Sequence, residues 1–286
     1  MIEMGAPSSF LKFAWAQHHL EALKEEVRRF EEDQPAVIMA EFKPKRPGYD
    51  LVLRVRRQTP DRIPLLAGDV IGCLRDALDH VIYELSFYNS SGSPPHKTAW
   101  PICEYRSQWP MRRSNKSGVN NHSGEFKVQS IPREARARAY RHQPFYRKRS
   151  PGPHRHHPLW VLDELRNIDK HRRLNIMPVV GVGFSATVAT SVPIVRQISR
   201  RKAASDGTVV ERTWLTPGAR ESDVSVKAVP AVKICLDEPS AFQPRVSLIP
   251  MLDWLVKQVG TVLMNFAEFQ PDAAKQFMEA GPFQNV

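Results

Sequence analysis

The segment from Leu74 to His80 places Arg75, Asp76, Asp79 and His80 within two turns of one predicted helix. Residues four apart on a helix are neighbours, so Arg75 can pair with Asp79 and Asp76 with His80. One interpretation is a solvated helix face with two surface ion pairs, each contributing about 0.3–0.5 kcal/mol. The alternative is a functional arrangement of an arginine, a polar residue and a histidine on an amphipathic helix.

This arrangement resembles the R-x(4–6)-H signature of HEPN ribonuclease domains, which are helical bundles. Arg75, Asp76 and His80 match the signature position by position and are the candidate catalytic residues. The resemblance implies metal-independent RNA cleavage in a defence or toxin system, with Arg75 neutralising the scissile phosphate and His80 transferring protons. On one helix these two residues lie about 140° apart, so the resemblance also implies a homodimer that completes the site.

A second group of ionisable residues lies at the C-terminal end of the helix predicted at residues 158–172. Asp169, Lys170, His171 and Arg172 place a carboxylate, an amine, an imidazole and a guanidinium within one turn. Positive charge is favoured at a helix C-terminus by the unpaired carbonyl groups, so one interpretation is simple helix capping. The alternative is that these residues, together with Asp79, support the Arg75–His80 motif. A pair between Arg75 and Asp169 is then expected, because a guanidinium fork matches a carboxylate.

The two motifs together resemble a group of uncharacterised bacterial proteins. The first reads L-R-x-x-L-D-H, and the second, within Leu162–Arg172, reads L-x-x-L-x-N-x-D-K-H-R. Between them, Gln143, Pro144 and Phe145 are similar to a Q-P-aromatic element of that group. The resemblance spans Leu65–Leu174 and implies a shared fold and site location, without implying a reaction.

Much of the net charge of +11 lies between Arg133 and Arg155, where eight arginines and lysines face one acid, Glu134. Aromatic residues alternate with these cations, a mixture that single-stranded nucleic acids bind through phosphates and base faces. Single-stranded nucleic acid is therefore the predicted partner, and the resemblance to HEPN domains implies RNA; a solvated basic loop is the alternative. The candidate nucleic-acid-binding residues are Arg141, Phe145, Tyr146, Arg147, Lys148 and Arg149.

Four histidines in the same region raise the possibility of a transition-metal site. They are His142, His154, His156 and His157. No cysteine or carboxylate completes the set and prolines interrupt it, so no metal and no other cofactor is predicted.

Hydrophobic periodicity predicts an α+β fold built on a four-helix bundle. The predicted helices cover residues 9–32, 64–87, 158–172 and 247–269. Their apolar residues recur every three or four positions, including Leu11 and Trp15 in the first helix and Leu74 and Leu78 in the second. The predicted β segments are an N-terminal hairpin at 36–57 and a β-rich insertion at 174–236 before the last helix. Residues 89–157 are predicted to be an irregular basic excursion, with a short helix at 133–141.

The composition indicates a single domain in a reducing compartment. The chain has 286 residues with ordinary proportions of apolar and charged side chains, and three cysteines too widely spaced for a zinc or redox motif. No leader or membrane span is recognisable, so a cytoplasmic location without membrane partners is expected. The leading hypothesis is an RNA-binding protein with HEPN-like endoribonuclease activity. The alternative is a non-catalytic module that binds nucleic acid or protein.

Overall fold

The structure is a computed structural model that describes residues 7–43, 46–90, 92–111, 113–114, 118–119, 122–146, 156–199, 206–238 and 245–269. These residues contain both helices and antiparallel sheets, so the predicted α+β class is confirmed. The helices are α1 (Ser8–Glu32), α2 (Arg62–Asn89), α3 (Gly124–Lys127), α4 (Arg133–Arg141), α5 (Pro158–His171) and α6 (Leu248–Phe266). The strands are β1 (Ala36–Phe42), β2 (Gly48–Val55), β3 (Arg113–Ser114), β4 (Gly118–Val119), β5 (Ile176–Thr190), β6 (Ile194–Ser199), β7 (Val209–Leu215), β8 (Val224–Leu236) and β9 (Val246–Ser247).

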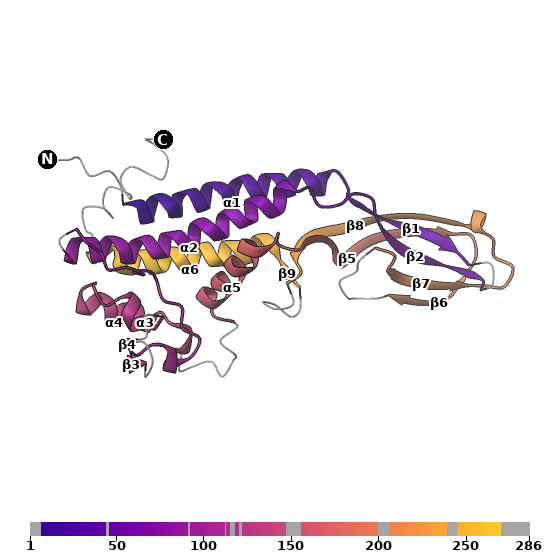
Figure 1. Ribbon diagram of the computed structural model, residues 1–286. Coiled ribbons are helices and arrows are strands. Elements are labelled where there is room, and N and C mark those ends of the chain that lie inside the picture. The colour runs from indigo at the N-terminus through magenta and orange to yellow at the C-terminus, as the bar shows by residue number, and fades with distance from the viewer. Residues whose placement is uncertain are drawn as a thin grey trace.

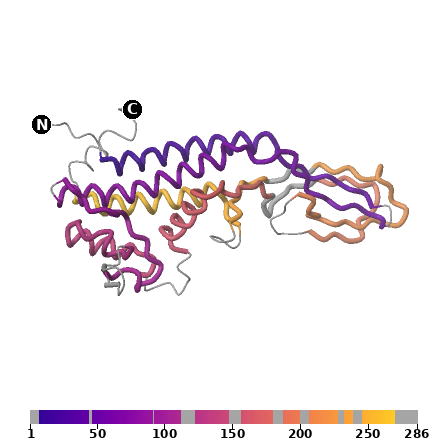
Figure 2. The backbone as a smooth tube through the Cα atoms, in the orientation of Figure 1, coloured from indigo at the N-terminus to yellow at the C-terminus, as the bar shows by residue number. Residues whose placement is uncertain are grey.

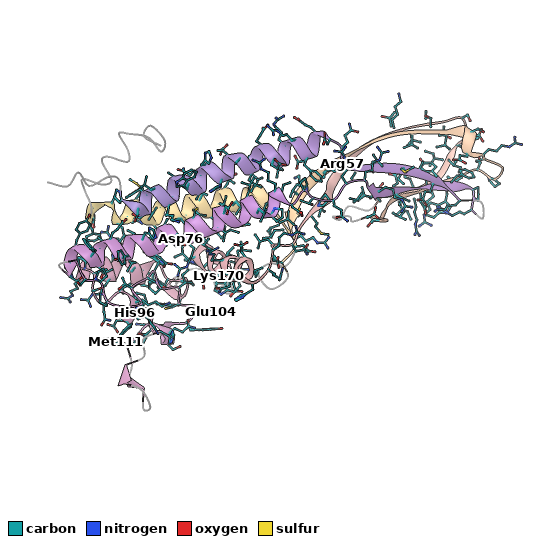
Figure 3. All side chains as sticks on the ribbon, turned by 45° about the horizontal axis from the view of Figure 1, so that its top comes forward. Arg57, Asp76, His96, Glu104, Met111 and Lys170 are labelled. Atoms are coloured by element: carbon teal, nitrogen blue, oxygen red, sulfur yellow. The ribbon has the colours of Figure 1, made fainter. Side chains whose placement is uncertain are left out.

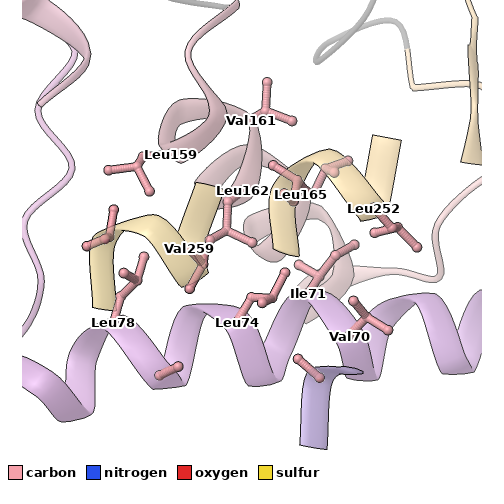
Figure 4. Packing of buried hydrophobic residues seen from close by; sticks show 14 of the residues in the cluster. Val70, Ile71, Leu74, Leu78, Leu159, Val161, Leu162, Leu165, Leu252 and Val259 are labelled. Carbon is pink, nitrogen blue, oxygen red and sulfur yellow. The ribbon is translucent and has the colours of Figure 1, made fainter. Parts of the chain in front are cut away.

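Helix α2 supplies the centre of the helical core. Its apolar side chains recur at helical spacing, and Leu74, Leu78 and Ile82 are fully buried, as the predicted stripe requires. Figure 4 shows this stripe facing residues of α5 and α6, among them Leu162 and Val259. Helices α1, α2 and α6 contact one another and run side by side, whereas the shorter α5 is inclined to them (Figure 1).

The predicted buried stripe of α1 is wrong at its beginning. Leu11 and Trp15 are each 39% exposed, whereas Phe10 and Ala14 are buried. The pairs 10/14 and 11/15 have the same four-residue spacing and are rotated by about 100° from each other. The sequence pattern fits either pair, and only the packed structure shows that the pair 10/14 is the buried one.

Strands β1, β2, β6 and β7 and most of β5 and β8 gather at the end of the molecule away from the helices, whereas β3, β4 and β9 lie beside helices (Figures 1 and 2). The predicted hairpin is present: β1 and β2 pair antiparallel, with Ala36 opposite Val55. It does not stand alone, because β2 also pairs with β7 in a four-stranded sheet of order β1-β2-β7-β6. Strands β5 and β8 form a long ribbon. Its valines pack against a second apolar core that contains Tyr49 and Leu51.

The described part of residues 89–157 contains the predicted short helix, now α4. It also contains α3 and the β3–β4 pair, which were not predicted, and several of its side chains belong to the helical core. Trp100, Ile131, Ala135 and Ala139 are all buried there. Ile131, Ala135 and Ala139 recur at four-residue spacing, as one face of a helix requires. Trp100 lies far from them in the sequence, so its burial depends on the way the chain folds back onto α2 and α6.

Candidate functional site

Arg75 is held between α2, α5 and the segment around Trp100. Its Nη1 donates to Oδ1 of Asp79 at 2.6 Å, and its Nη2 donates to the carbonyl oxygen of Trp100 at 3.0 Å. Its Nε lies 3.4 Å from Oδ1 of Asp163 on α5, and only 14% of the side chain is exposed. The predicted Arg75–Asp79 pair is therefore confirmed, and Arg75 joins three segments of the fold.

Asp79 completes this arrangement from the same helix. Its Oδ1 accepts the Arg75 guanidinium and also the backbone N–H of Trp100, at 2.9 Å. Burial raises the pKa of the Asp79 carboxyl, and the charge of Arg75 and the Trp100 N–H oppose that rise. The positive charge of Arg75 thus stabilises the negative charge of the partly buried Asp79 carboxylate.

Asp76 and His80 face α1 instead. Asp76 forms an ion pair with Lys12 of α1 at 3.0 Å, and Nδ1 of His80 lies 2.9 Å from Oγ of Ser8. The Ser8 hydroxyl donates its proton to Glu84 at 2.7 Å, so His80 Nδ1–H acts as the donor to Ser8. The predicted Asp76–His80 pair is wrong, because both residues have partners on the neighbouring helix.

The structure does not bring the candidate catalytic residues together within one chain. Arg75 contacts α5 and Trp100, whereas Asp76 and His80 contact the first turns of α1. This separation agrees with the 140° expected from helical geometry. Within one chain, the Arg75 guanidinium and the His80 imidazole therefore lie on different sides of α2.

Asp169 does not pair with Arg75, so that prediction is also wrong. It pairs with Arg166 on its own helix at 3.2 Å, and its carboxylate lies against the backbone of Gly68 on α2. A Cβ atom at Gly68 would meet Asp169 Oδ1 at 2.5 Å. Burial raises the pKa of the Asp169 carboxyl, and Arg166 opposes that rise. Asp169 is thus part of a close approach between α2 and α5.

The remaining residues of the second motif separate into two groups. Lys170 and His171 are exposed at the end of α5, where Figure 3 labels Lys170. Arg172 binds Glu238 through two hydrogen bonds of 3.0 and 2.6 Å, and Glu238 is 1% exposed. Glu238 also accepts the backbone N–H of Asn175 at 2.7 Å. Arg172 therefore fastens the end of α5 to the segment that follows β8.

Gln143 belongs to the Q-P-aromatic element, which did not predict the structural role that the side chain has. Its side chain is buried, and its Oε1 accepts the backbone N–H of Cys103 at 2.9 Å. Its Nε2 donates to the carbonyl oxygens of Pro101 and Ala139, each at 3.0 Å. The only signal for this role was the Q-P-aromatic element. Gln143 fastens the segment after Trp100 to the end of α4.

An open groove of about 500 Å³ lies along α4. We call it the arginine–aromatic groove, and its charged and aromatic lining residues are Arg133, Arg136, Arg141, Trp109, Tyr140, Tyr146 and Glu125. Two predicted nucleic-acid-binding residues, Arg141 and Tyr146, line it. Phe145 packs against Tyr140 with ring centroids 5.1 Å apart. Arg147, Lys148 and Arg149 lie outside the described residues.

The aromatic rings of the groove meet edge to face. The centroids of Trp109 and Tyr140 are 5.1 Å apart with an interplanar angle of 81°, and those of Tyr140 and Tyr146 are 5.5 Å apart at 74°. Trp109 lies against Gly124, where a Cβ atom would meet the indole at 2.6 Å. Sequence reasoning missed Trp109, which lies 24 residues before the basic segment. The glycine lets the indole approach, so Trp109 is held beside α4.

The arginines of α4 have two different environments. Arg138 binds Glu268 and the carbonyl oxygen of Asn265, and its guanidinium stacks over Phe269. By contrast, within the part of the chain that the structure describes, the three groove arginines have no acidic partner within 4.0 Å. Arg138 therefore anchors α4 to the end of α6, and the groove carries a net positive charge, because its three arginines outnumber its one carboxylate, Glu125.

The histidines do not assemble a metal site among the described residues. His157 caps α5, because its Nδ1 accepts the backbone N–H of Leu159 at 3.3 Å. His142 is half-buried, with Nε2 at 3.2 Å from Asn265, and burial lowers its pKa. His156 is exposed, and His154 lies outside the described residues.

Two assemblies remain as candidates for function. The first is the Arg75–His80 motif, whose members bind protein groups on opposite sides of α2. The second is the arginine–aromatic groove, whose guanidinium groups and aromatic rings can bind a ligand that carries negative charges and aromatic rings. None of the described helices is long and apolar enough to cross a membrane. In comparisons with protein-family models, curated proteins and solved structures, the chain has no match.

Proposed function

We propose that this protein binds single-stranded RNA through the arginine–aromatic groove. One observation supports the proposal above all others. Three arginines without an acidic partner among the described residues share a groove with Trp109 and two tyrosines.

The chemistry of the groove matches that of an unpaired nucleic-acid strand. Guanidinium groups bind phosphates and release the counterions that surround them, which contributes affinity at low salt. Aromatic faces stack on bases, and each stacked base contributes about 1–3 kcal/mol. A double helix conceals its base faces, whereas an unpaired strand presents phosphates and bases together.

Binding without cleavage is the form of the proposal that the geometry favours. Arg75 is occupied by Asp79, Asp163 and the Trp100 carbonyl, so it is not free to bind phosphate. HEPN-like cleavage remains the alternative hypothesis. It would require Arg75 to exchange these partners and a second copy to bring its His80 nearby.

The proposal retains three further predictions, which concern the helical fold, the oligomeric state and the location of the protein. We propose that α1, α2, α5 and α6 form a four-helix bundle, which is supported by their shared core. A homodimer is proposed as the assembly in which the alternative cleavage hypothesis has to be tested. A cytoplasmic location is proposed because Cys73, Cys103 and Cys235 are all unpaired.

The proposal is tested by replacing the three groove arginines with alanine. Wild-type protein and the Arg133→Ala/Arg136→Ala/Arg141→Ala variant are titrated with a fluorescent eight-nucleotide oligo(U) at several salt concentrations. Loss of three phosphate contacts is expected to reduce the slope of log affinity against log salt by about 2, since each contributes about 0.7 for single strands.

A charge-matched variant makes this test specific. Arg56, Arg220 and Lys227 are exposed in the β part, and their replacement by alanine removes the same charge elsewhere. This control is expected to retain the wild-type slope. Absence of oligo(U) binding by the wild type at low salt, or equal losses in both variants, would show that the groove is not the RNA site.

A further inference from the structure

We propose that Glu125 makes the arginine–aromatic groove selective for an unpaired guanine base. This inference rests on the proposed RNA binding and adds the identity of one base to it. Glu125 lines the groove together with the three arginines and three aromatic rings. It is the feature that phosphate binding does not explain, because a carboxylate repels phosphate.

The position of Glu125 is fixed by the backbone around Trp109. Its N–H donates to the carbonyl oxygen of Trp109 at 2.9 Å, and its Oε2 accepts the backbone N–H of Met111 at 2.9 Å. Figure 3 labels Met111 on the segment that leads towards β3. These bonds fix the carboxylate in the groove that the Trp109 side chain also lines, so a base that stacks in the groove can present its edge to Glu125.

The carboxylate retains hydrogen-bonding capacity after binding Met111. An ionised carboxylate has two oxygens and about four acceptor positions, of which the Met111 N–H uses one. Among the described residues, no arginine or lysine lies within 4.0 Å of Glu125, although three arginines line the same groove. The Glu125 carboxylate can therefore accept hydrogen bonds from a ligand in the groove.

Guanine is the base that matches this acceptor best. Its Watson–Crick edge presents two adjacent donors, the N1–H and the exocyclic N2 amine, which can meet the two carboxylate oxygens in parallel. Adenine and cytosine present one exocyclic amine beside an acceptor nitrogen, and uracil presents one N–H between two carbonyls. A bidentate contact to a base edge contributes about 1–3 kcal/mol of discrimination.

The experiment compares eight-nucleotide strands that differ at one position. The probes are oligo(U) and the same strand with one central guanosine, inosine or adenosine, and binding is measured by fluorescence anisotropy. Wild-type protein is expected to bind the guanosine strand about tenfold more tightly than oligo(U). Inosine lacks the exocyclic amine and is expected to lose most of that gain, and adenosine is expected to show none.

Glu125→Gln is the decisive variant, since glutamine can still accept the Met111 N–H. It is expected to bind oligo(U) at least as well as the wild type but to prefer guanosine less than twofold. Glu134→Gln removes an exposed acid from α4 without touching the groove and should keep the full preference. The guanine assignment is overturned if the wild type binds all strands equally or if Glu125→Gln keeps the full preference for guanosine. In either case, binding of oligo(U) by the wild type still supports the proposed function. Failure of every strand to bind overturns both.

Discussion

Arg75 is bound by acceptors from three segments, and this makes it a stabilising residue. Replacing it with alanine leaves the Asp79 carboxylate partly buried without its counter-charge. We expect the free energy of unfolding to fall by about 2–4 kcal/mol, measured by urea denaturation. His80→Ala removes one partly exposed hydrogen bond to Ser8 and is expected to cost less than about 1 kcal/mol. Wild-type stability in Arg75→Ala would instead indicate an arginine available for phosphate.

The pKa of Asp79 gives a pH-dependent test of the same contact. A raised pKa means that the folded state holds the proton more tightly than the unfolded state does. The stabilisation is therefore complete below the ordinary value of 3.8 and is lost as the pH rises through the raised value. Asp79→Asn retains an oxygen for Arg75 and Trp100 but cannot titrate. Its cost in unfolding free energy is expected to be larger at pH 3.5 than at pH 7, and a cost that grows with pH would contradict this.

At the scale of elements, the close approach of α2 and α5 depends on Gly68. Alanine usually stabilises a helix by about 1 kcal/mol relative to glycine. Here the new Cβ would displace Asp169 from its position beside Arg166, so Gly68→Ala is expected to destabilise by about 1–2 kcal/mol. In an Asp169→Ala background the same change should become stabilising. Urea denaturation of the wild type, the two single variants and the double variant measures both effects. The same sign in both backgrounds would show that Asp169 is not the obstacle.

At the scale of the whole molecule, two apolar cores lie in the helical and β parts. Leu78 is fully buried in the first and Leu51 in the second. Each replacement by alanine is expected to cost about 2–5 kcal/mol where it acts. Native-state hydrogen exchange should show faster exchange mainly in β1, β2 and β7 for Leu51→Ala, and in α2 and α6 for Leu78→Ala. Uniform acceleration along the chain in both variants would mean that the two cores unfold as one.

The sequence by itself determined the local structure. Apolar residues at three- and four-residue spacing predicted α2 and its buried stripe, because a helix that buries one face has to repeat that pattern. Alternation and turn residues likewise predicted the hairpin of β1 and β2. The Arg75–Asp79 pair was also predicted by four-residue spacing on one helix. The same spacing did not suffice for Asp76 and His80, whose partners lie on α1.

Only the tertiary structure decided which distant segments meet. The pairing of β2 with β7, the use of Arg172 to bind Glu238 and the position of Trp109 beside α4 join residues far apart in the chain. Local periodicity records that a face is buried, but it does not record which segment covers it. The same limit explains why Arg75 was expected to pair with Asp169. Both residues are correctly placed on their helices, but α5 packs so that Asp169 lies against Gly68, about two turns of α2 before Arg75.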